Sequence, residues 1–178
     1  MANYCSQVLS GIGLTCNNTI GGIRAVYIAN RGDVIAATIE DEVITALTLS
    51  SSAKFHKYLF RKNSSSNMVS TKSGDDAAGT HVISTNVAMT FAGMDTEKRV
   101  EMDALSVGQF LVIVEDRNGK FWMPILPTED YMAASAGEGN TGSTTSEANQ
   151  YTITLTGDAN HYPYEVEAAA MSSIVVTL

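Results

Sequence analysis

Side chains able to do acid–base or metal chemistry are few in this chain. His56, His81 and His161 show no HxxxH or HxH spacing, so they form no local metal-binding pair. The acid pairs Asp75-Asp76 and Glu115-Asp116 fall in or beside expected turns, where solvated carboxylates are common. A general acid would instead need burial to raise its pKa. These patterns predict neither an enzyme nor a bound metal or cofactor.

Two short motifs match the letters of known binding sites, but we interpret them as ordinary loop and turn sequences. The run Gly137-Glu-Gly-Asn-Thr-Gly142 has the letters of a dinucleotide fingerprint, but no strand precedes it and no helix follows it. Arg31-Gly-Asp33 spells an adhesion tripeptide and equally suits a hairpin turn, which we favour. His81 shares an expected strand face with Ile83 and Val87, so we expect it in the core or an interface.

Length and charge further narrow the classes of protein to which this chain could belong. The 178 residues suit one domain, 1–178, and the net charge of −8 argues against duplex binding through phosphates. No uncharged stretch is apolar enough to span a bilayer, and the start lacks the basic region of a secretory signal. Cys5 and Cys16 fit no zinc or redox spacing. A disulfide between them stays open, although free thiols are favoured.

Charge is distributed unevenly along the chain. All 11 Lys and Arg residues lie at or before Lys120, whereas residues 121–178 carry only acids. The acid-free stretch Val43–Gly74 holds a basic block of Lys54, Lys57, Arg61, Lys62 and Lys72. Unlike patches of this kind can join copies head to tail. The alternative is a solvated charged face on each side.

Period-two alternation predicts a mainly β fold. We expect a hairpin of Gly22–Ala29 and Val34–Ile39 around the turn Asn30–Asp33, followed by further strands. Asp116-Arg-Asn-Gly119 predicts a type I′ turn. The further strands are expected at residues 43–49, 53–62, 80–91, 110–114, 121–123 and 151–156. The apolar C-terminal run 174–178 is expected to pair in a sheet, either the chain's own or a neighbour's.

Three segments lack the alternation of strands. Residues 1–21 are expected to form an N-terminal arm, 63–79 a long inter-strand loop and 133–149 a flexible loop of small residues. One helix is expected from Asp95 to Val107, with Val100, Ala104 and Val107 on one face. The predicted fold is a β-sandwich or barrel with one flanking α-helix and long loops.

Several stretches resemble tail tube (major tail) proteins of tailed bacteriophages. They are Gly21-Gly22-Ile-Arg-Ala-Val-Tyr-Ile-Ala29 after Cys16, Val43-Ile-Thr-Ala-Leu-Thr-Leu49, the Phe55–Arg61 strand, the helix before Gly108, Val112-Ile-Val-Glu-Asp-Arg-Asn-Gly119-Lys-Phe-Trp122, the small-residue loop and Asn149-Gln-Tyr-Thr-Ile-Thr-Leu-Thr-Gly157. The likeness covers most of the chain as a style of strands and turns, without a chemical signature.

The resemblance implies a structural virion protein that self-assembles into rings, typically hexamers, stacked into the hollow tail tube. Inner strands of every subunit would form one continuous barrel, and double-stranded DNA would pass through it during genome ejection without specific binding. The protein would be made in the host bacterial cytoplasm and end in the virion tail, in contact with other tail or neck proteins and with no membrane.

Two sets of site residues follow as predictions. The basic block Lys54, Lys57, Arg61, Lys62 and Lys72 is predicted to contact neighbouring subunits, and Glu165 and Glu167 to face the lumen. A neck or tail-completion ring, or another virion structural protein, is the alternative in the same context. The second alternative is a surface carbohydrate-binding β-sandwich that uses its Trp and Tyr side chains for stacking.

Overall fold

The computed structural model describes residues 11–13, 19–75, 77–174 and 176–177, and it is mainly β, with 49% strand and 11% helix. The elements are β1 (Ile23–Asn30), β2 (Val34–Glu40), β3 (Val43–Leu49), β4 (Phe55–Leu59), β5 (Asn67–Ser73), β6 (Val82–Ala92), α1 (Thr96–Val107), β7 (Phe110–Asp116), β8 (Phe121–Met123), β9 (Ala133–Asn140), β10 (Gln150–Ala159), β11 (Tyr164–Val166), α2 (Ala168–Ser173) and β12 (Val176–Thr177). They form two sheets, neither closed into a barrel.

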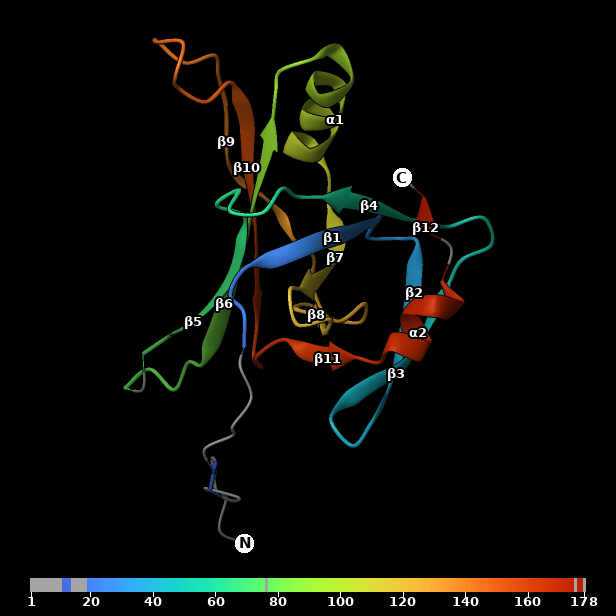
Figure 1. The fold of residues 1–178 in the computed structure, drawn as a ribbon. Coiled ribbons are helices and arrows are strands. Elements are labelled where there is room, and N and C mark those ends of the chain that lie inside the picture. Colours follow the sequence, from blue (N-terminus) through green and yellow to red (C-terminus); the bar gives the residue numbers. More distant parts are fainter. Residues whose placement is uncertain (1–10, 14–18, 76, 175, 178) are drawn as a thin grey trace, which may run out of the picture.

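The eight-stranded sheet has the order β12-β4-β1-β7-β8-β11-β3-β2 and curls around its own interior (Figure 1). Residues 25–29 of β1 and 110–115 of β7 are buried without a break, so both faces of these central strands are covered. On one face the rings of Tyr58 and Phe60 contact Phe91 of the other sheet. On the enclosed side, α2 packs against β3 and buries Ala170 and Met171.

The four-stranded sheet has the order β5-β6-β10-β9, and all its neighbours are antiparallel. Its inner face carries the buried apolar residues that alternation predicts on β6 and β10: Ile83, Val87, Met89, Ile153 and Leu155. The expected loop 63–79 instead contains strand β5, which pairs with β6. The expected loop 133–149 contains strand β9, and only residues 141–149 are irregular.

Strand pairing corrects the expected hairpin of β1 and β2. β1 and β2 follow one another but do not pair, because β1 pairs with β4 and β7 while β2 pairs with β3. β4 and β6, which flank the expected loop 63–79, belong to different sheets. The turn after Asn30 therefore redirects the chain within the eight-stranded sheet instead of closing a hairpin.

The turn between β7 and β8 also differs from its prediction. Gly119 has φ +82°, but Asn118 is not at positive φ, so the type I′ turn is wrong. The N–H of Gly119 donates to the carbonyl of Asp116 (3.3 Å), as in a type I turn followed by a left-handed glycine. Two hydrogen bonds join Asn118 to the backbone of Ile20, at 2.9 and 3.0 Å.

Helix α1 begins as predicted, because the Asp95 side chain accepts a hydrogen bond from the N–H of Lys98 (2.8 Å). The buried residues are Met102 and Leu105, which face β9 and β10. The predicted apolar face is exposed, with Val100 at 53%, Val107 at 86% and Ala104 also open to solvent. A second helix, α2, was not predicted.

The two ends of the chain have different outcomes. Val176 and Thr177 form β12 beside β4, so the C-terminal run is paired in the chain's own sheet, which is one of the two arrangements expected. In the predicted arm 1–21, only residues 11–13 and 19–21 are described, and they have no regular structure. Cys5 and Cys16 lie outside the described residues, as does Asp76.

Candidate assembly surface

The four-stranded sheet has an outer face that turns away from the core. Alternation from the buried residues and the strand register place its members on four strands. They are Asn67, Val69, Thr71 and Ser73 on β5; Val82, Ser84, Asn86, Ala88, Thr90 and Ala92 on β6; Gln150, Thr152, Thr154, Thr156 and Asp158 on β10; and Ser135, Ala136, Glu138 and Asn140 on β9.

This outer face is polar and nearly free of charge. Its members are mostly Ser, Thr, Asn and Ala, its two charged residues are Glu138 and Asp158, and no Lys or Arg belongs to it. Hydroxyl groups bond across the strands: Thr156 Oγ1 lies 2.6 Å from Asn86 Oδ1 and 2.7 Å from Ser135 Oγ. Short side chains that bond to one another leave a smooth surface whose two charged residues are both acids.

Both edges of this sheet are open. Neither β5 nor β9 has a second strand neighbour among the described residues, and neither contains Pro. Each has one charged residue, Lys72 on β5 and Glu138 on β9. An edge exposes unpaired backbone N–H and C=O groups that can template another strand, and proteins usually protect edges with charges, Pro or a cover. β5 is sparsely protected, whereas helix α1 lies beside β9.

The two edges are related in direction and offset. Because the sheet has four antiparallel strands, β5 and β9 run in opposite directions. β5 pairs with the Val82–Ala88 part of β6, whereas β9 lies beside the Gln150–Thr156 part of β10, toward the other end of the sheet. A closed barrel of tilted strands needs such an offset between its edges.

The structure divides the predicted basic block. Lys54 is exposed just before β4, Arg61 and Lys62 are exposed just after it, and Lys72 is exposed on β5 in the other sheet. Lys57 belongs elsewhere, because its side chain turns to Glu115 (3.9 Å) and lies over the ring of Tyr27 (5.1 Å). Lys57 is therefore committed mainly within its own chain.

Glu115 is the clearest departure from the sequence interpretation. It is buried at 6% exposure, not solvated beside a turn. The Tyr27 hydroxyl donates to it at 2.8 Å, and Arg24 lies 3.4 Å away. Burial, reinforced by the Glu115 carboxylate, raises the pKa of Tyr27 above its usual value despite the nearby Lys57. These contacts join β1, β4 and β7 on the enclosed side of the eight-stranded sheet.

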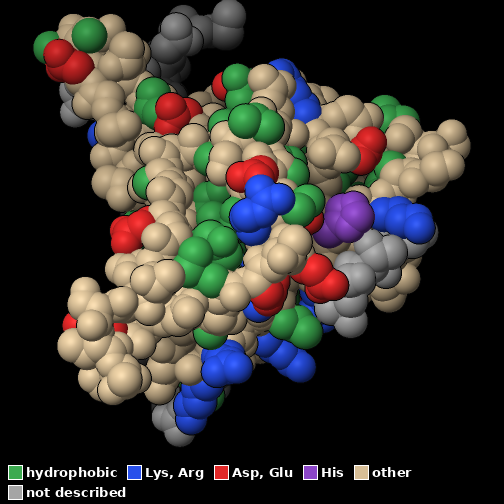
Figure 2. All heavy atoms as spheres, turned by 90° about the horizontal axis from the view of Figure 1, so that it is seen from above, with side chains coloured by type: hydrophobic (Ala, Val, Ile, Leu, Met, Phe, Trp, Pro, Cys, Tyr) green, Lys and Arg blue, Asp and Glu red, His purple; other side chains and the backbone are tan. Residues whose placement is uncertain are grey.

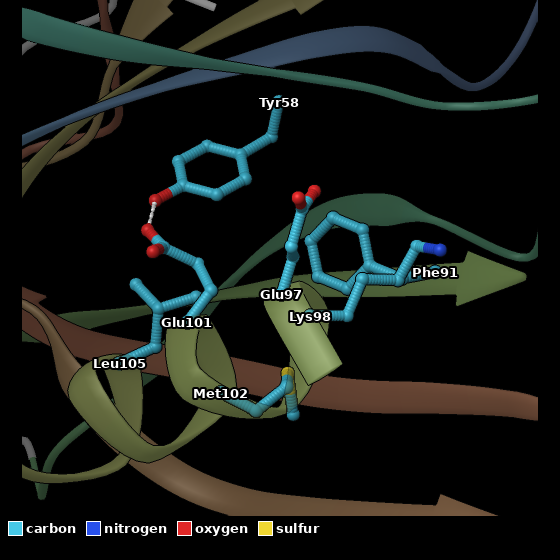
Figure 3. A pocket seen from close by; sticks show the side chains of 7 residues that line it. All are labelled: Tyr58, Phe91, Glu97, Lys98, Glu101, Met102 and Leu105. Carbon is cyan, nitrogen blue, oxygen red and sulfur yellow. Dashed lines mark hydrogen bonds between the residues drawn. The ribbon is translucent and has the colours of Figure 1, made fainter. Parts of the chain in front are cut away.

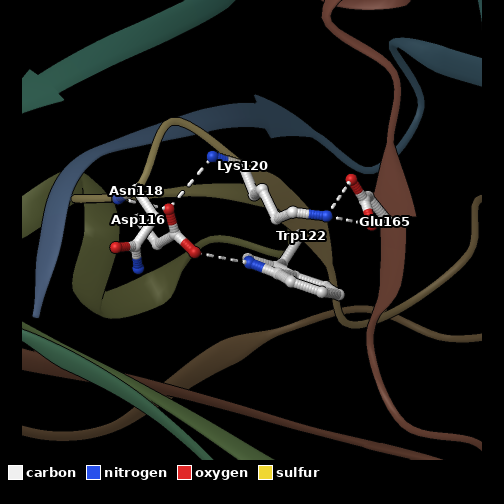
Figure 4. Close-up of polar contacts among 5 residues, drawn as sticks. All are labelled: Asp116, Asn118, Lys120, Trp122 and Glu165. Carbon is white, nitrogen blue, oxygen red and sulfur yellow. Dashed lines mark hydrogen bonds and ion pairs between the residues drawn. The ribbon is translucent and has the colours of Figure 1, made fainter. Parts of the chain in front are cut away.

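The predicted lumen acids lie in the eight-stranded sheet. Glu165 on β11 forms an ion pair with Lys120 at 2.8 Å (Figure 4), and Glu167 is exposed just before α2. Beside them, Asp116 accepts hydrogen bonds from the N–H groups of Asn118 (2.7 Å) and Lys120 (3.0 Å), and from the Trp122 indole (3.2 Å). Burial opposes ionisation of Asp116, but these donors hold its pKa below the usual value.

A small hollow of about 250 Å³ lies between β4, β6 and α1 (Figure 3). Tyr58 donates a hydrogen bond to Glu101 there, and Phe91, Met102 and Leu105 form the apolar lining. Burial and the Glu101 carboxylate raise the pKa of Tyr58 above its usual value. Glu97 and Lys98 are the other polar lining residues.

The remaining motif residues do not gather into a site. His161 is not isolated, because it lies 2.9 Å from Glu129 and contacts the ring of Tyr164. His81 is exposed and does not lie in the core. Gly137 and Gly139 lie in strand β9, with no helix after them. Across residues 11–13, 19–75, 77–174 and 176–177, no group of three His, Cys, Asp or Glu residues could hold a metal ion.

Sequence reasoning missed the outer face as a unit, although the Thr152, Thr154, Thr156 alternation indicated its central row. Within the described part of the chain, no helix is long and apolar enough to cross a membrane. Comparison with known protein families, with curated proteins and with solved structures finds no match.

Proposed function

We propose that this chain is the subunit of a phage tail tube, a structural protein that assembles into stacked rings around a channel for DNA. The observation that carries the proposal is the four-stranded sheet: a face without Lys or Arg, bounded by two open edges of opposite direction. The eight-stranded sheet and α1 pack against the inner face of this sheet.

The open edges provide a route to a closed ring. If copies are related by rotation about an axis roughly along the strands, β9 of one copy meets β5 of the next, and the pair is antiparallel. Each copy then adds four antiparallel strands to one barrel, and no edge remains exposed. The ring size, six in the resembled family, is not needed for this argument.

The outer face would then line the channel. Duplex DNA carries about one negative charge per 1.7 Å, and it binds proteins mainly through Lys and Arg contacts to phosphate. A lining of Ser, Thr, Asn and Ala provides no such contacts, and Glu138 and Asp158 repel the polyanion. In this proposal these two acids take the place of Glu165 and Glu167, which lie on the other sheet.

The carbohydrate-binding alternative receives less support. A stacking platform needs exposed aromatic faces, yet Trp122, Tyr131, Tyr151 and Tyr164 are only partly exposed, and the Trp122 indole is bonded to Asp116. Tyr162 alone among these five side chains is largely open, at 60%. The aromatic residues therefore fit packing better than ligand stacking.

Negative-stain microscopy of the concentrated, purified protein tests the proposal. Hollow tubes of stacked rings are expected. Single rings that never stack would favour the neck or tail-completion alternative. Material that stays monomeric at high concentration, checked by light scattering, would overturn both assembly readings.

A further inference from the structure

The β2–β3 hairpin ends in an acidic tip, defined as Glu40, Asp41 and Glu42. Asp41 and Glu42 both have positive φ, +48° and +64°, as in a type I′ turn. Asn-Gly is the favoured pair for such a turn, so two acids in left-handed conformations are an uncommon choice. All three tip residues are exposed, and none forms an ion pair with another described residue.

A basic hollow of about 330 Å³ lies between the segment after β4, the end of β6 and the start of α1. Its charged lining residues are Arg61, Lys62 and Lys98, and no acid lines it. Lys98 pairs with Asp95, whereas Arg61 and Lys62 form no ion pair within the described part of the chain. Leu59, 56% exposed, adds an apolar contact surface. Figure 2 looks down on this end, where Lys and Arg side chains group along the lower edge.

The tip and the hollow lie at opposite ends of the molecule. The hollow borders Ala92 and Gln150, which are paired at one end of the four-stranded sheet. The tip lies beside residues 161–165, which follow the other end of β10 at Ala159. The ten residues of β10 span about 30 Å at 3.3 Å per residue. Figure 1 shows the β2–β3 tip low in the view and the start of α1 high. The two features therefore cannot meet within one copy.

We infer that the acidic tip of one copy seats in the basic hollow of a second copy, stacked along the strand direction. The carboxylates of the tip face Arg61 and Lys62, and Ile39, 38% exposed just before the tip, lies against Leu59. A protruding acidic turn and a concave basic surface are complementary in shape and in charge. The contact is heterologous, so it repeats from copy to copy without closing on itself.

This inference rests on the proposed function only for the direction in which copies stack, which is the axis of the tube. It assigns the residues of the ring-to-ring contact. Charge reversal tests it. The tip variant is Glu40→Lys with Glu42→Lys, the hollow variant is Arg61→Glu with Lys62→Glu, and a third protein carries all four substitutions. The matched control is Lys54→Glu, an exposed cation outside the hollow.

We expect the tip and hollow variants to form unstacked rings, and the fourfold variant and the Lys54→Glu control to form tubes. Melting curves confirm that each variant is folded. If the tip variant and the hollow variant both form the same tubes as the wild type, the docking contact is overturned and the tube proposal stays intact. Solid filaments without a channel, lost on reversal and restored in the fourfold variant, would support the docking contact and overturn the tube. Wild-type protein that stays single overturns both.

Discussion

The two sheets of this molecule differ in how much of their surface is buried within the chain. The eight-stranded sheet buries both faces of β1 and β7, and it pairs its buried carboxylate, Glu115, within the chain. The four-stranded sheet buries one face only, and leaves β5 and β9 open. Both sheets end in edge strands, β12 and β2 in the first and β5 and β9 in the second, so the difference between them lies in their buried faces. In our proposal a neighbouring copy completes the second sheet.

This difference separates stability from assembly. Substitutions inside the eight-stranded sheet should lower the free energy of unfolding. Substitutions at the edges of the four-stranded sheet should leave the monomer folded and remove the assembly. The predictions below test that separation, beginning with the largest expected effect.

Proline in β5 should abolish ring formation. On an edge strand every second N–H group points outward, and the others bond to the neighbouring strand, here β6. Of the adjacent variants Val69→Pro and Ser70→Pro, one therefore removes an outward N–H and the other removes an N–H bonded to β6. The variant that loses the outward N–H should keep its melting temperature and stay monomeric by sedimentation. Ser51→Pro is the control, because Ser51 precedes Ser52 (φ +78°) in a hydrogen-bonded turn that favours Pro. Rings formed by both β5 variants would rule out edge pairing.

Removing the buried carboxylate should destabilise the monomer. Glu115→Ala leaves the Tyr27 hydroxyl without its acceptor and Lys57 without its counter-ion, so the free energy of unfolding should fall by about 2–3 kcal/mol. Urea denaturation measures this change. Asp103→Ala removes an exposed pair with Arg99 and should change it by less than about 0.5 kcal/mol. Equal effects of the two substitutions would mean that the Glu115 cluster adds no stability.

The Asp116 carboxylate should make stability depend on acid pH. Its pKa is lowered in the folded state, so its contribution is complete above the unfolded pKa, about 3.9, and is lost as pH falls through the lower folded value. Asp116→Asn should therefore be less stable than wild type by about 1 kcal/mol at pH 7. The difference should shrink below about pH 4. A difference that stays constant from pH 7 to pH 2 would contradict the assigned hydrogen bonding.

A cation on the outer face should change DNA contact without changing the fold. Thr154→Lys should alter the free energy of unfolding by less than about 0.5 kcal/mol. Assembled tubes of this variant should retain short duplex DNA in low salt and release it as salt rises. The control Thr154→Ser should behave as wild type. Identical DNA retention by wild-type and Thr154→Lys tubes would place this face outside the channel.

The regular parts of the fold could be predicted because local pattern and tertiary structure agree there. β6 and β10 alternate strictly, β7 is a continuous apolar run, and α1 has a capping acid. β5 and β9 were missed because edge strands of Ser, Thr, Gly and Ala bury few large side chains and show no apolar period. The β1–β2 hairpin failed since pairing partners depend on contacts distant in sequence.

The site was less predictable than the fold. Glu115 becomes buried only because Arg24, Tyr27 and Lys57 reach it from other strands, and no local sequence signal marks this. The basic block was one run in sequence but is divided by the fold, since Lys57 turns inward and Lys72 belongs to the other sheet. Whether a charge faces a neighbour depends on this three-dimensional division.

Amide hydrogen exchange, compared between assembled and monomeric protein by mass spectrometry, tests the central claim most directly. Peptides covering β5 and β9 should gain protection on assembly, because their outward N–H groups become hydrogen-bonded. Peptides covering β7 should be protected equally in both states. Assembled material in which β5 and β9 exchange as fast as in the monomer would contradict the account.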